Sequence, residues 1–244
     1  MIAIDIKSKM FPAKGRAGHH LAIADLQLSF NIGDFVCLVG PSGCGKTTLL
    51  NIIADLDHDY EGRISFGLRQ THPKIGYVFQ NPRLLPWRTV RENIELAIEA
   101  NSSSENIDAL LEVMQLSKFQ HVYPERLSLG MSRRVAIIRA FAINPDVLLM
   151  DEPFVSLDAP TARQVRKLLI TLWQQRPHTV LFVTHDLREA IMLADRIVFL
   201  AAAPMKVIRE IAVPIPRSDR DNEKVIETFR QQLLNANPEL RQCV

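Results

Sequence analysis

Apolar residues occupy every second position in two stretches near the start of the chain: Ile2, Ile4 and Ile6, then Leu26, Leu28 and Phe30. A period of two is typical of a β-strand that buries one face and exposes the other. The opening of the chain is therefore predicted to be rich in strands.

Three later stretches are apolar without a break: Phe35–Val39, Val147–Met150 and Thr179–Val183. A continuous apolar run suits a strand that is covered on both faces of a parallel sheet. Amphipathic helical patterns lie between these runs, and the clearest follows Pro160, a residue that the first turn of a helix tolerates well. Strands that alternate with helices predict a doubly wound α/β fold.

The middle of the chain, from about residue 89 to residue 141, has several helical stretches and no convincing strand pattern. It is predicted to be a helical insertion in the α/β core. The segment after Pro214 is polar and rich in arginine, and a helix is predicted there from Asn222 to Asn235.

Composition changes this picture little. The 244 residues are 47% apolar and 23% charged, as in an ordinary globular protein whose core needs no metal or disulfide. With 29 Lys and Arg against 27 Asp and Glu, the net charge of +2 is too balanced to favour a nucleic-acid partner. Cys37, Cys44 and Cys243 lack the paired spacing of a metal site, which indicates a reducing compartment.

No apolar run approaches the roughly 18 to 20 residues that a membrane-spanning helix needs. The first residues include Asp5, where a signal peptide would be basic and then apolar. We therefore expect a cytosolic chain, for which any membrane role must come through a partner.

A glycine-rich motif follows the apolar run that ends at Val39. It reads Gly40-Pro41-Ser42-Gly43-Cys44-Gly45-Lys46-Thr47, matches G-x-x-x-x-G-K-[ST], and is followed by Thr48. Backbone N–H groups of such a loop converge on phosphate oxygens, and the positive end of the next helix adds to their field. Lys46 is expected to reach the outer phosphates and the Thr47 hydroxyl to ligate Mg²⁺. The alternative is a merely flexible glycine turn.

Two acids, Asp151 and Glu152, follow the apolar run Val147–Met150. Open α/β sheets bind ligands at the carboxyl ends of their strands. One carboxylate there can hold Mg²⁺ through water, and the next can polarise a water that attacks the terminal phosphate. Solvated acids at a strand end are the alternative, but together with the glycine-rich motif the pair predicts hydrolysis of a nucleoside triphosphate.

Further motifs follow in a fixed order: Leu127-Ser128-Leu129-Gly130-Met131, Asp151-Glu152-Pro153, Ser156-Leu157-Asp158 and Thr184-His185-Asp186. With these motifs in this order, the chain resembles the ATP-binding cassette (ABC) ATPases along nearly its whole length. The resemblance implies a P-loop NTPase core of the α/β class, with an antiparallel β subdomain, an inserted helical subdomain, and ATP and Mg²⁺ as cofactors. The expected segments are a β-rich subdomain with the nucleotide-binding core (1–88), a helical signature subdomain (89–143), the rest of the core (144–213) and a polar helical tail (214–244).

The resemblance also implies roles for single residues. Phe11 matches the aromatic that stacks on adenine, and Gln80 matches the glutamine that senses Mg²⁺ and the attacking water. Asp151 matches the Mg²⁺-associated acid, Glu152 the general base, and His185 the histidine that contacts the terminal phosphate. Phe11 could instead only pad the β-rich part of the chain, and Gln80 could cap a strand.

In this family the Ser-x-Gly segment completes the active site of the opposite subunit. Ser128 and Gly130 are thus expected to face nucleotide held by a second ATPase subunit, in a head-to-tail dimer, with Asp158 communicating across the interface. Leu129 departs from the pattern, since a glycine usually stands there and a side chain can crowd the phosphate. Two alternatives remain open: a nucleotide-dependent clamp or regulatory module with impaired hydrolysis, and a non-transport ABC ATPase.

An apolar loop with Leu84, Leu85 and Trp87 follows Gln80. Exposed patches of this kind mark protein contacts, although the side chains could also fold back on the helical insertion. In the family this surface receives a membrane-spanning permease. The chain is most similar to importers for nitrate, sulfonate and taurine, which implies a peripheral subunit at the cytoplasmic face of the inner or plasma membrane that works indirectly with a solute-binding protein.

Overall fold

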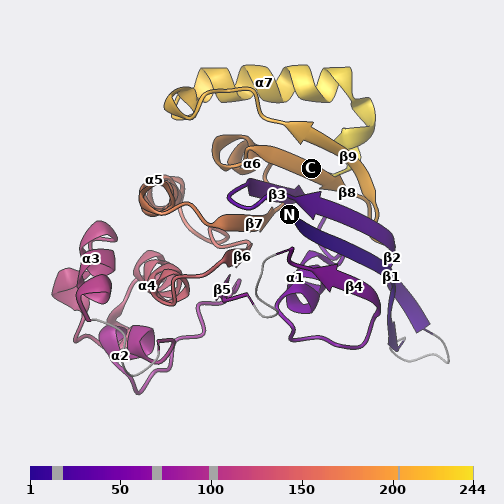
Figure 1. Cartoon of the computed structure of the whole chain (residues 1–244). Helices are drawn as coiled ribbons and strands as arrows, with labels where there is room; N and C mark the ends of the chain where they lie inside the picture. The colour runs from indigo at the N-terminus through magenta and orange to yellow at the C-terminus, as the bar shows by residue number, and fades with distance from the viewer. Residues whose placement is uncertain (13–18, 68–72, 99–103, 203, 244) are drawn as a thin grey trace. The chain divides into compact units, whose positions relative to one another are not determined.

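The computed structural model describes residues 1–12, 19–67, 73–98, 104–202 and 204–243 (Figure 1). The chain divides into two compact units, residues 1–71 together with 179–244, and residues 72–178. Both units contain strands and helices, and the predicted α/β class is confirmed.

The first unit contains a three-stranded antiparallel sheet in the order β2-β1-β4. Its strands are β1 (Ile2–Pro12), β2 (His19–Phe30) and β4 (Glu61–Ser65). In the register of β1 with β2, Ile4 faces Leu28 and Ile6 faces Leu26, and all four side chains are buried. The alternation seen in the sequence is therefore the buried face of this sheet.

The second sheet of this unit follows the order β7-β3-β8-β9. Its strands are β3 (Phe35–Val39), β7 (Thr179–Thr184), β8 (Arg196–Leu200) and β9 (Val207–Ala212). The strands β7, β3 and β8 run parallel, and β9 pairs antiparallel with β8. Every residue of β3 and β7 is buried, as the unbroken apolar runs predicted.

The helices of the first unit are α1 (Lys46–Ile53), α6 (Leu187–Leu193) and α7 (Glu223–Ala236), with the 3₁₀ turns η3 (Arg217–Asp219) and η4 (Pro238–Cys243). Helix α6 packs against β3, and α7, the long yellow helix in Figure 1, packs on α6. Asn222 caps α7 by accepting a hydrogen bond from the Lys224 N–H, so the predicted C-terminal helix is confirmed to within one residue at each end.

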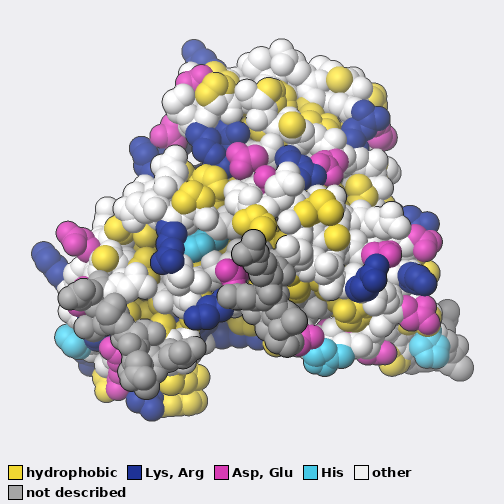
Figure 2. Space-filling model, viewed as in Figure 1, with side chains coloured by type: hydrophobic (Ala, Val, Ile, Leu, Met, Phe, Trp, Pro, Cys, Tyr) yellow, Lys and Arg dark blue, Asp and Glu magenta, His cyan; other side chains and the backbone are white. Residues whose placement is uncertain are grey.

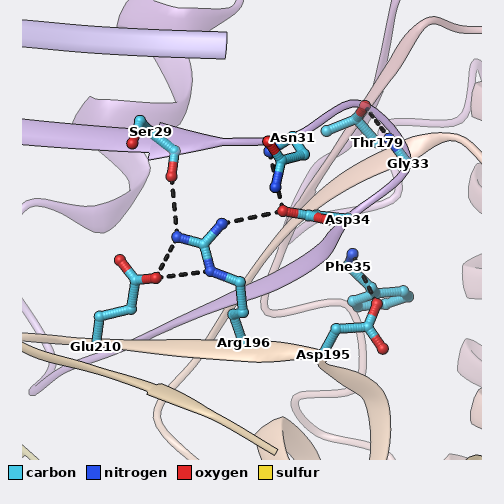
Figure 3. A network of polar contacts seen from close by, with 9 residues as sticks. All are labelled: Ser29, Asn31, Gly33, Asp34, Phe35, Thr179, Asp195, Arg196 and Glu210. Atoms are coloured by element: carbon cyan, nitrogen blue, oxygen red, sulfur yellow. Dashed lines mark hydrogen bonds and ion pairs between the residues drawn. The ribbon is translucent and has the colours of Figure 1, made fainter. Parts of the chain in front are cut away.

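An arginine on β8 joins four segments of the first unit (Figure 3). The guanidinium of Arg196 donates to Asp34 Oδ2 at 3.0 Å, to the Ser29 carbonyl at 3.0 Å and to Glu210 Oε1 at 2.6 Å. Ser29 belongs to β2, Asp34 to the turn before β3, and Glu210 to β9. Because that turn leads directly into β3, the network fixes the start of the strand whose far end carries the glycine-rich motif.

The second unit pairs two parallel strands with several helices. Its elements are β5 (Ile75–Val78), α2 (Val90–Glu95), α3 (Ser104–Val113), η1 (Ser117–Phe119), η2 (Pro124–Arg126), α4 (Leu129–Ala142), β6 (Val147–Asp151) and α5 (Ala159–Gln175). Helix α4 contacts α2, α3, α5 and β5, so it is the central helix of the unit. Between residues 89 and 141 the described positions form no strand, as predicted.

Basic and acidic side chains are interspersed over the face of the molecule that Figure 2 shows. This mixture agrees with the small net charge of +2. Within the described ranges, no helix combines the length and the apolar character needed to cross a bilayer.

Candidate nucleotide-binding site

The glycine-rich loop connects the end of β3 to the start of α1. Gly43 and Gly45 have φ of +79° and +105°, the left-handed region that residues with a Cβ rarely adopt. A Cβ on Gly40 would lie 3.1 Å from both the Cβ and the carbonyl oxygen of Leu200 on β8. The loop therefore depends on glycine for both its conformation and its close packing on the sheet.

Lys46, the first residue of α1, is 5% exposed. Its Nζ donates to the Gly40 carbonyl at 2.7 Å and to the Pro41 carbonyl at 3.0 Å. The backbone N–H groups at the start of an α-helix have no partner within the helix and attract anions. The ammonium and the first turn of α1 thus belong to one strand-loop-helix segment, in which Ser42, Gly43 and Thr47 are exposed.

His185 follows β7 at the same sheet edge as the glycine-rich loop. Thr184, the last residue of β7, is in register with Val39, the last residue of β3. The Thr184 hydroxyl accepts a hydrogen bond from the Asp186 N–H at 3.0 Å and donates to Glu189 Oε2 at 2.9 Å. These bonds fix the turn that carries the exposed His185, directly after the strand that pairs with β3.

Phe11 lies near the end of β1 in the same unit, and its side chain is 37% exposed. It pairs in register with His20 on β2. The partial exposure leaves ring surface accessible for stacking, so the ring is suited to the predicted adenine contact.

The acid pair and Gln80 meet in the second unit. The parallel pairing of β5 with β6 sets Val78 opposite Met150, so Gln80 and Glu152 each stand two residues beyond this pair at the same edge of the sheet. Gln80 Nε2 donates to Glu152 Oε2 at 3.5 Å. Glu152 has φ of +42°, a conformation that costs on the order of 1 to 3 kcal/mol for a residue with a side chain and that is concentrated at functional sites.

Asp151 ends β6 and is 4% exposed. Burial, with the charge of Asp151 as the second cause, raises the pKa of Tyr77 on the neighbouring strand above its ordinary value. The charge of Asp151 therefore acts on Tyr77 across the β5-β6 pair.

The Ser-x-Gly segment forms the start of helix α4. Ser128 is the N-cap residue, and its Oγ accepts a hydrogen bond from the Met131 N–H at 3.2 Å. Leu129 is 43% exposed, so its side chain does not fill the core of the unit. Gly130 is buried, and a Cβ on it would lie 2.5 Å from Thr161 Cγ2 on α5.

Asp158 is the N-cap residue of α5 and accepts a hydrogen bond from the Thr161 N–H at 3.0 Å. Hydrogen bonds from Thr161, first from its side chain and then from its backbone, hold the pKa of Asp158 below its ordinary value. The same threonine therefore contacts Asp158 and packs against Gly130, so the two segments predicted to face a second subunit are held together.

Arginines on α4 hold the loop after Gln80, a feature that the sequence analysis missed. The Arg133 guanidinium is 4% exposed and donates to the Gln80 carbonyl, while Arg139 donates to the carbonyls of Pro82 at 2.7 Å and Arg83 at 2.9 Å. The available signal was that arginines, three in all, interrupt the apolar residues of α4. They link the helix that begins at Ser128 to the segment that carries Gln80.

The apolar loop after Gln80 is shaped by Asn93, which is fully buried on α2. Its side chain accepts a hydrogen bond from the Leu85 N–H at 2.7 Å and donates to the Leu85 and Arg88 carbonyls at 3.1 and 2.9 Å. Leu84 and Leu85 are half-buried, and Trp87 is 69% exposed. The tryptophan is therefore presented to solvent by a loop with a fixed backbone.

The predicted site residues divide between the two units. The first unit holds Phe11, Gly40 to Thr48 and His185, and the second holds Gln80, Ser128, Gly130, Asp151, Glu152 and Asp158. In the first unit, the glycine-rich loop and His185 follow neighbouring strands. In the second unit, Gln80 contacts Glu152, and Thr161 links Asp158 to Gly130.

Comparisons with known proteins identify the family of the chain. A sequence profile described as ABC transporter matches residues 23–155. The aliphatic sulfonates import ATP-binding protein SsuB of Bacillus cereus is 41% identical over 96% of this chain and 94% of its own length. The nitrate import ATP-binding protein NrtD of Synechococcus elongatus is also 41% identical, over 93% of this chain and 85% of its own length.

Solved structures give the same result. The dimeric structure of MJ0796, a bacterial ABC transporter cassette, has a TM-score of 0.76 and 32% identity, covering 88% of this chain and 100% of that one. A post-hydrolysis state of MJ0796 bound to ADP and Pi gives 0.74 and 31% over the same shares of the two chains. The resemblance drawn from the ordered motifs is confirmed, and so is the cassette fold. The profile spans more than half of the chain and the relatives match nearly all of it, so this chain belongs to the ABC transporter family.

Proposed function

We propose that this chain is the ATP-hydrolysing subunit of an ABC importer for a small solute, with aliphatic sulfonates and nitrate as the leading solute classes. The glycine-rich loop carries the proposal, because its left-handed glycines and buried Lys46 stand at the end of a fully buried strand. The relatives named above, which are import ATP-binding proteins for these solutes, support the choice of solute.

The phosphates of ATP bind to the loop and the start of α1. Lys46 exchanges its carbonyl contacts for the outer phosphates, and backbone N–H groups from Gly40 to Thr48 surround the phosphate oxygens. Phe11 stacks on the adenine ring. The protein contributes position and charge rather than a covalent intermediate.

Hydrolysis adds a water oxygen to the terminal phosphorus while the bond to the ADP oxygen breaks. Glu152 accepts the proton that the water loses, Gln80 orients the water, and His185 donates to the oxygens of the terminal phosphate. The contact between Gln80 and Glu152 supports a joint role for these two side chains.

The residues proposed for Mg²⁺ are the Thr47 hydroxyl, the Gln80 amide oxygen and the Asp151 carboxylate. All three offer oxygen atoms, the ligands that Mg²⁺ prefers, and this cation commonly uses one or two carboxylates together with substrate phosphates. The donor set therefore fits the ion. When bound, the ion neutralises charge on the β- and γ-phosphate oxygens.

A second ATPase subunit completes each site in this proposal. Ser128 and the backbone at Gly130 contact the phosphates bound by the partner. Asp158 belongs to the same interface, because Thr161 donates a hydrogen bond to Asp158 and also packs against Gly130. A twofold arrangement of identical chains closes on itself without exposed unpaired interfaces. The four segments 1–88, 89–143, 144–213 and 214–244 remain the proposed functional division of the chain.

Trp87 and its loop are the proposed contact for the permease subunits, which place the chain at the cytoplasmic face of the inner or plasma membrane. The high exposure of Trp87 on a backbone fixed by Asn93 supports this assignment. A solute-binding protein acts indirectly, through the permease, and nucleic acid has no part.

Turnover of ATP by the purified chain with Mg²⁺ tests the proposal. Glu152→Gln should abolish turnover and trap an ATP-dependent dimer that size-exclusion chromatography with light scattering detects, whereas Glu125→Gln, at an exposed acid on η2, should do neither. Unchanged turnover in Glu152→Gln would show that Glu152 is not the general base. A chain that remains monomeric with ATP, even with its permease present, would contradict the shared site.

Solute uptake needs the assembled complex. Expression with candidate permease and solute-binding subunits, followed by transport of sulfonates and nitrate into proteoliposomes, identifies the solute. Co-purification with ribosomes or DNA in place of a permease would favour the non-transport alternative.

A further inference from the structure

Lys9 is buried although its position on β1 predicts exposure. The buried positions of β1 are Ile2, Ile4 and Ile6, and strict alternation would continue with residue 8. The pairing of β1 with β4 shifts between Ile6 and Ser8, and the next buried residue is Lys9, at 2% exposure. Such bulges turn side chains toward the opposite face and are common beside active sites.

The buried ammonium of Lys9 is held by the segment that links α1 to β4. Its Nζ donates to Asp57 Oδ1 at 2.8 Å, to the Asp59 carbonyl at 2.7 Å, and lies 3.5 Å from Asp59 Oδ2. A buried charge is stable only when it is paired and hydrogen-bonded, and these three acceptors match the three N–H donors. Lys9 therefore connects β1 to the loop that follows the phosphate-binding helix.

The same ammonium lies against the ring of Phe11, with Nζ 4.6 Å from the ring centroid. A cation within about 6 Å of an aromatic centroid is attracted by the negative face of the ring. One face of Phe11 is thus occupied by a cation that is itself anchored, and the ring keeps a partly exposed surface for another partner.

We propose that Lys9 is the positioning residue for the nucleotide base: it holds the Phe11 ring in place and directs adenine to the ring face opposite its ammonium. The inference rests on the proposed stacking of Phe11 on adenine. Through Asp57 and Asp59, Lys9 also sets the distance between the base contact and helix α1, where the phosphates bind.

Calorimetric titration with two ligands, ATP and inorganic tripolyphosphate in the presence of Mg²⁺, separates the base from the phosphates. Lys9→Met, combined with Asp57→Asn so that no partly buried carboxylate is left unpaired, should weaken ATP binding about three- to fivefold and leave tripolyphosphate binding unchanged. Lys9→Arg keeps the cation and should retain most of the ATP affinity. Lys7→Met, at an exposed lysine of the same strand, is the matched control and should bind both ligands as the parent does.

Tryptophan fluorescence at position 11 reports stacking of the base directly and would not change if Lys9 only stabilised the fold. In Phe11→Trp, ATP should quench the added tryptophan emission relative to the parent chain, and this quenching should fall when Lys9→Met and Asp57→Asn are added. Tripolyphosphate should quench in neither background.

The outcomes distinguish the two levels of the proposal. If Phe11→Ala leaves ATP binding unchanged, adenine does not stack on Phe11, and the role of Lys9 fails with it. If Phe11→Ala weakens ATP binding but removal of Lys9 does not, stacking stands and the positioning role is overturned. Equal weakening of ATP and tripolyphosphate on removal of Lys9 would also overturn it, because the lysine would then act on the fold and not on the base.

Discussion

Gly130 offers a sharp test of how the signature segment is packed. A Cβ placed on Gly130 lies 2.5 Å from Thr161 Cγ2, whereas non-bonded carbon atoms rest about 3.5 to 4.0 Å apart. The start of α4 or of α5 must therefore move by about 1 Å in Gly130→Ala, because two staggered positions of a β-branched threonine give it little freedom within a helix. Overpacking of this size costs about 1 to 3 kcal/mol.

The sign of the effect makes the test clear. Glycine to alanine inside a helix ordinarily stabilises by roughly 0.5 to 1 kcal/mol, so a net loss of stability in Gly130→Ala can only come from the contact with Thr161. Once this gain is subtracted from the packing cost, urea unfolding should show a free energy of unfolding up to about 2.5 kcal/mol below that of the parent. Turnover of ATP should fall as well, because the Ser128 end of α4 is displaced.

Thr161→Ser is the matched second change. It removes Cγ2 but keeps the hydroxyl and the N–H that bind Asp158, so alone it should alter stability little, and combined with Gly130→Ala it should restore most of the lost stability. A Gly130→Ala chain as stable as the parent would refute the reasoning. So would a double variant that remains as unstable as Gly130→Ala.

Three further predictions concern the same unit. Leu129→Gly should change ATP turnover by less than about threefold, because the side chain is largely exposed; a rise from almost no turnover to robust turnover would favour the regulatory alternative. Arg139→Met removes two hydrogen bonds to the loop after Gln80, so hydrogen-exchange mass spectrometry should detect faster amide exchange in that loop and unchanged exchange in α5. If the loop exchanges equally fast in the parent and in Arg139→Met, Arg139 does not hold the loop. Burial first, and then the charge of Arg176, lower the pKa of His178, so the unfolded chain binds the proton more readily and the free energy of unfolding should fall as pH drops below about 6.5; denaturant titrations of His178→Phe should show a shallower fall, and an identical slope would contradict the assignment.

Most of the fold could be predicted from local patterns in the sequence. The alternation at Ile2, Ile4 and Ile6 and the unbroken apolar run Phe35–Val39 each report which faces of a strand are buried, and burial of a face is a property of neighbouring residues. The turn of Lys9 toward the interior could not be predicted in this way, since it depends on a bulge against β4 and on acceptors about fifty residues away along the chain.

The site shows the same division between local and distant information. The order of motifs predicted the cassette and placed the loop, Gln80 and the acids at strand ends. Ser128 as a helix cap was also legible in principle, because serine before a helical stretch is a common N-cap. The role of Arg133 could not be predicted from the sequence, since α4 buries this arginine against carbonyls that lie far away along the chain.

The strained backbone at Glu152 lowers the stability of the protein at a residue that is proposed to serve its activity. Its left-handed φ of +42° is a conformation that glycine adopts without strain, so Glu152→Gly should relieve part of the cost while removing the carboxylate that the chemistry needs. A screen for heat-resistant variants of this protein would therefore tend to select against the residue proposed as its general base, the trade-off expected where a functional group is kept in a strained position. Gln, which has the same branching as Glu and so inherits the same strain, is for that reason the substitution that isolates the charge.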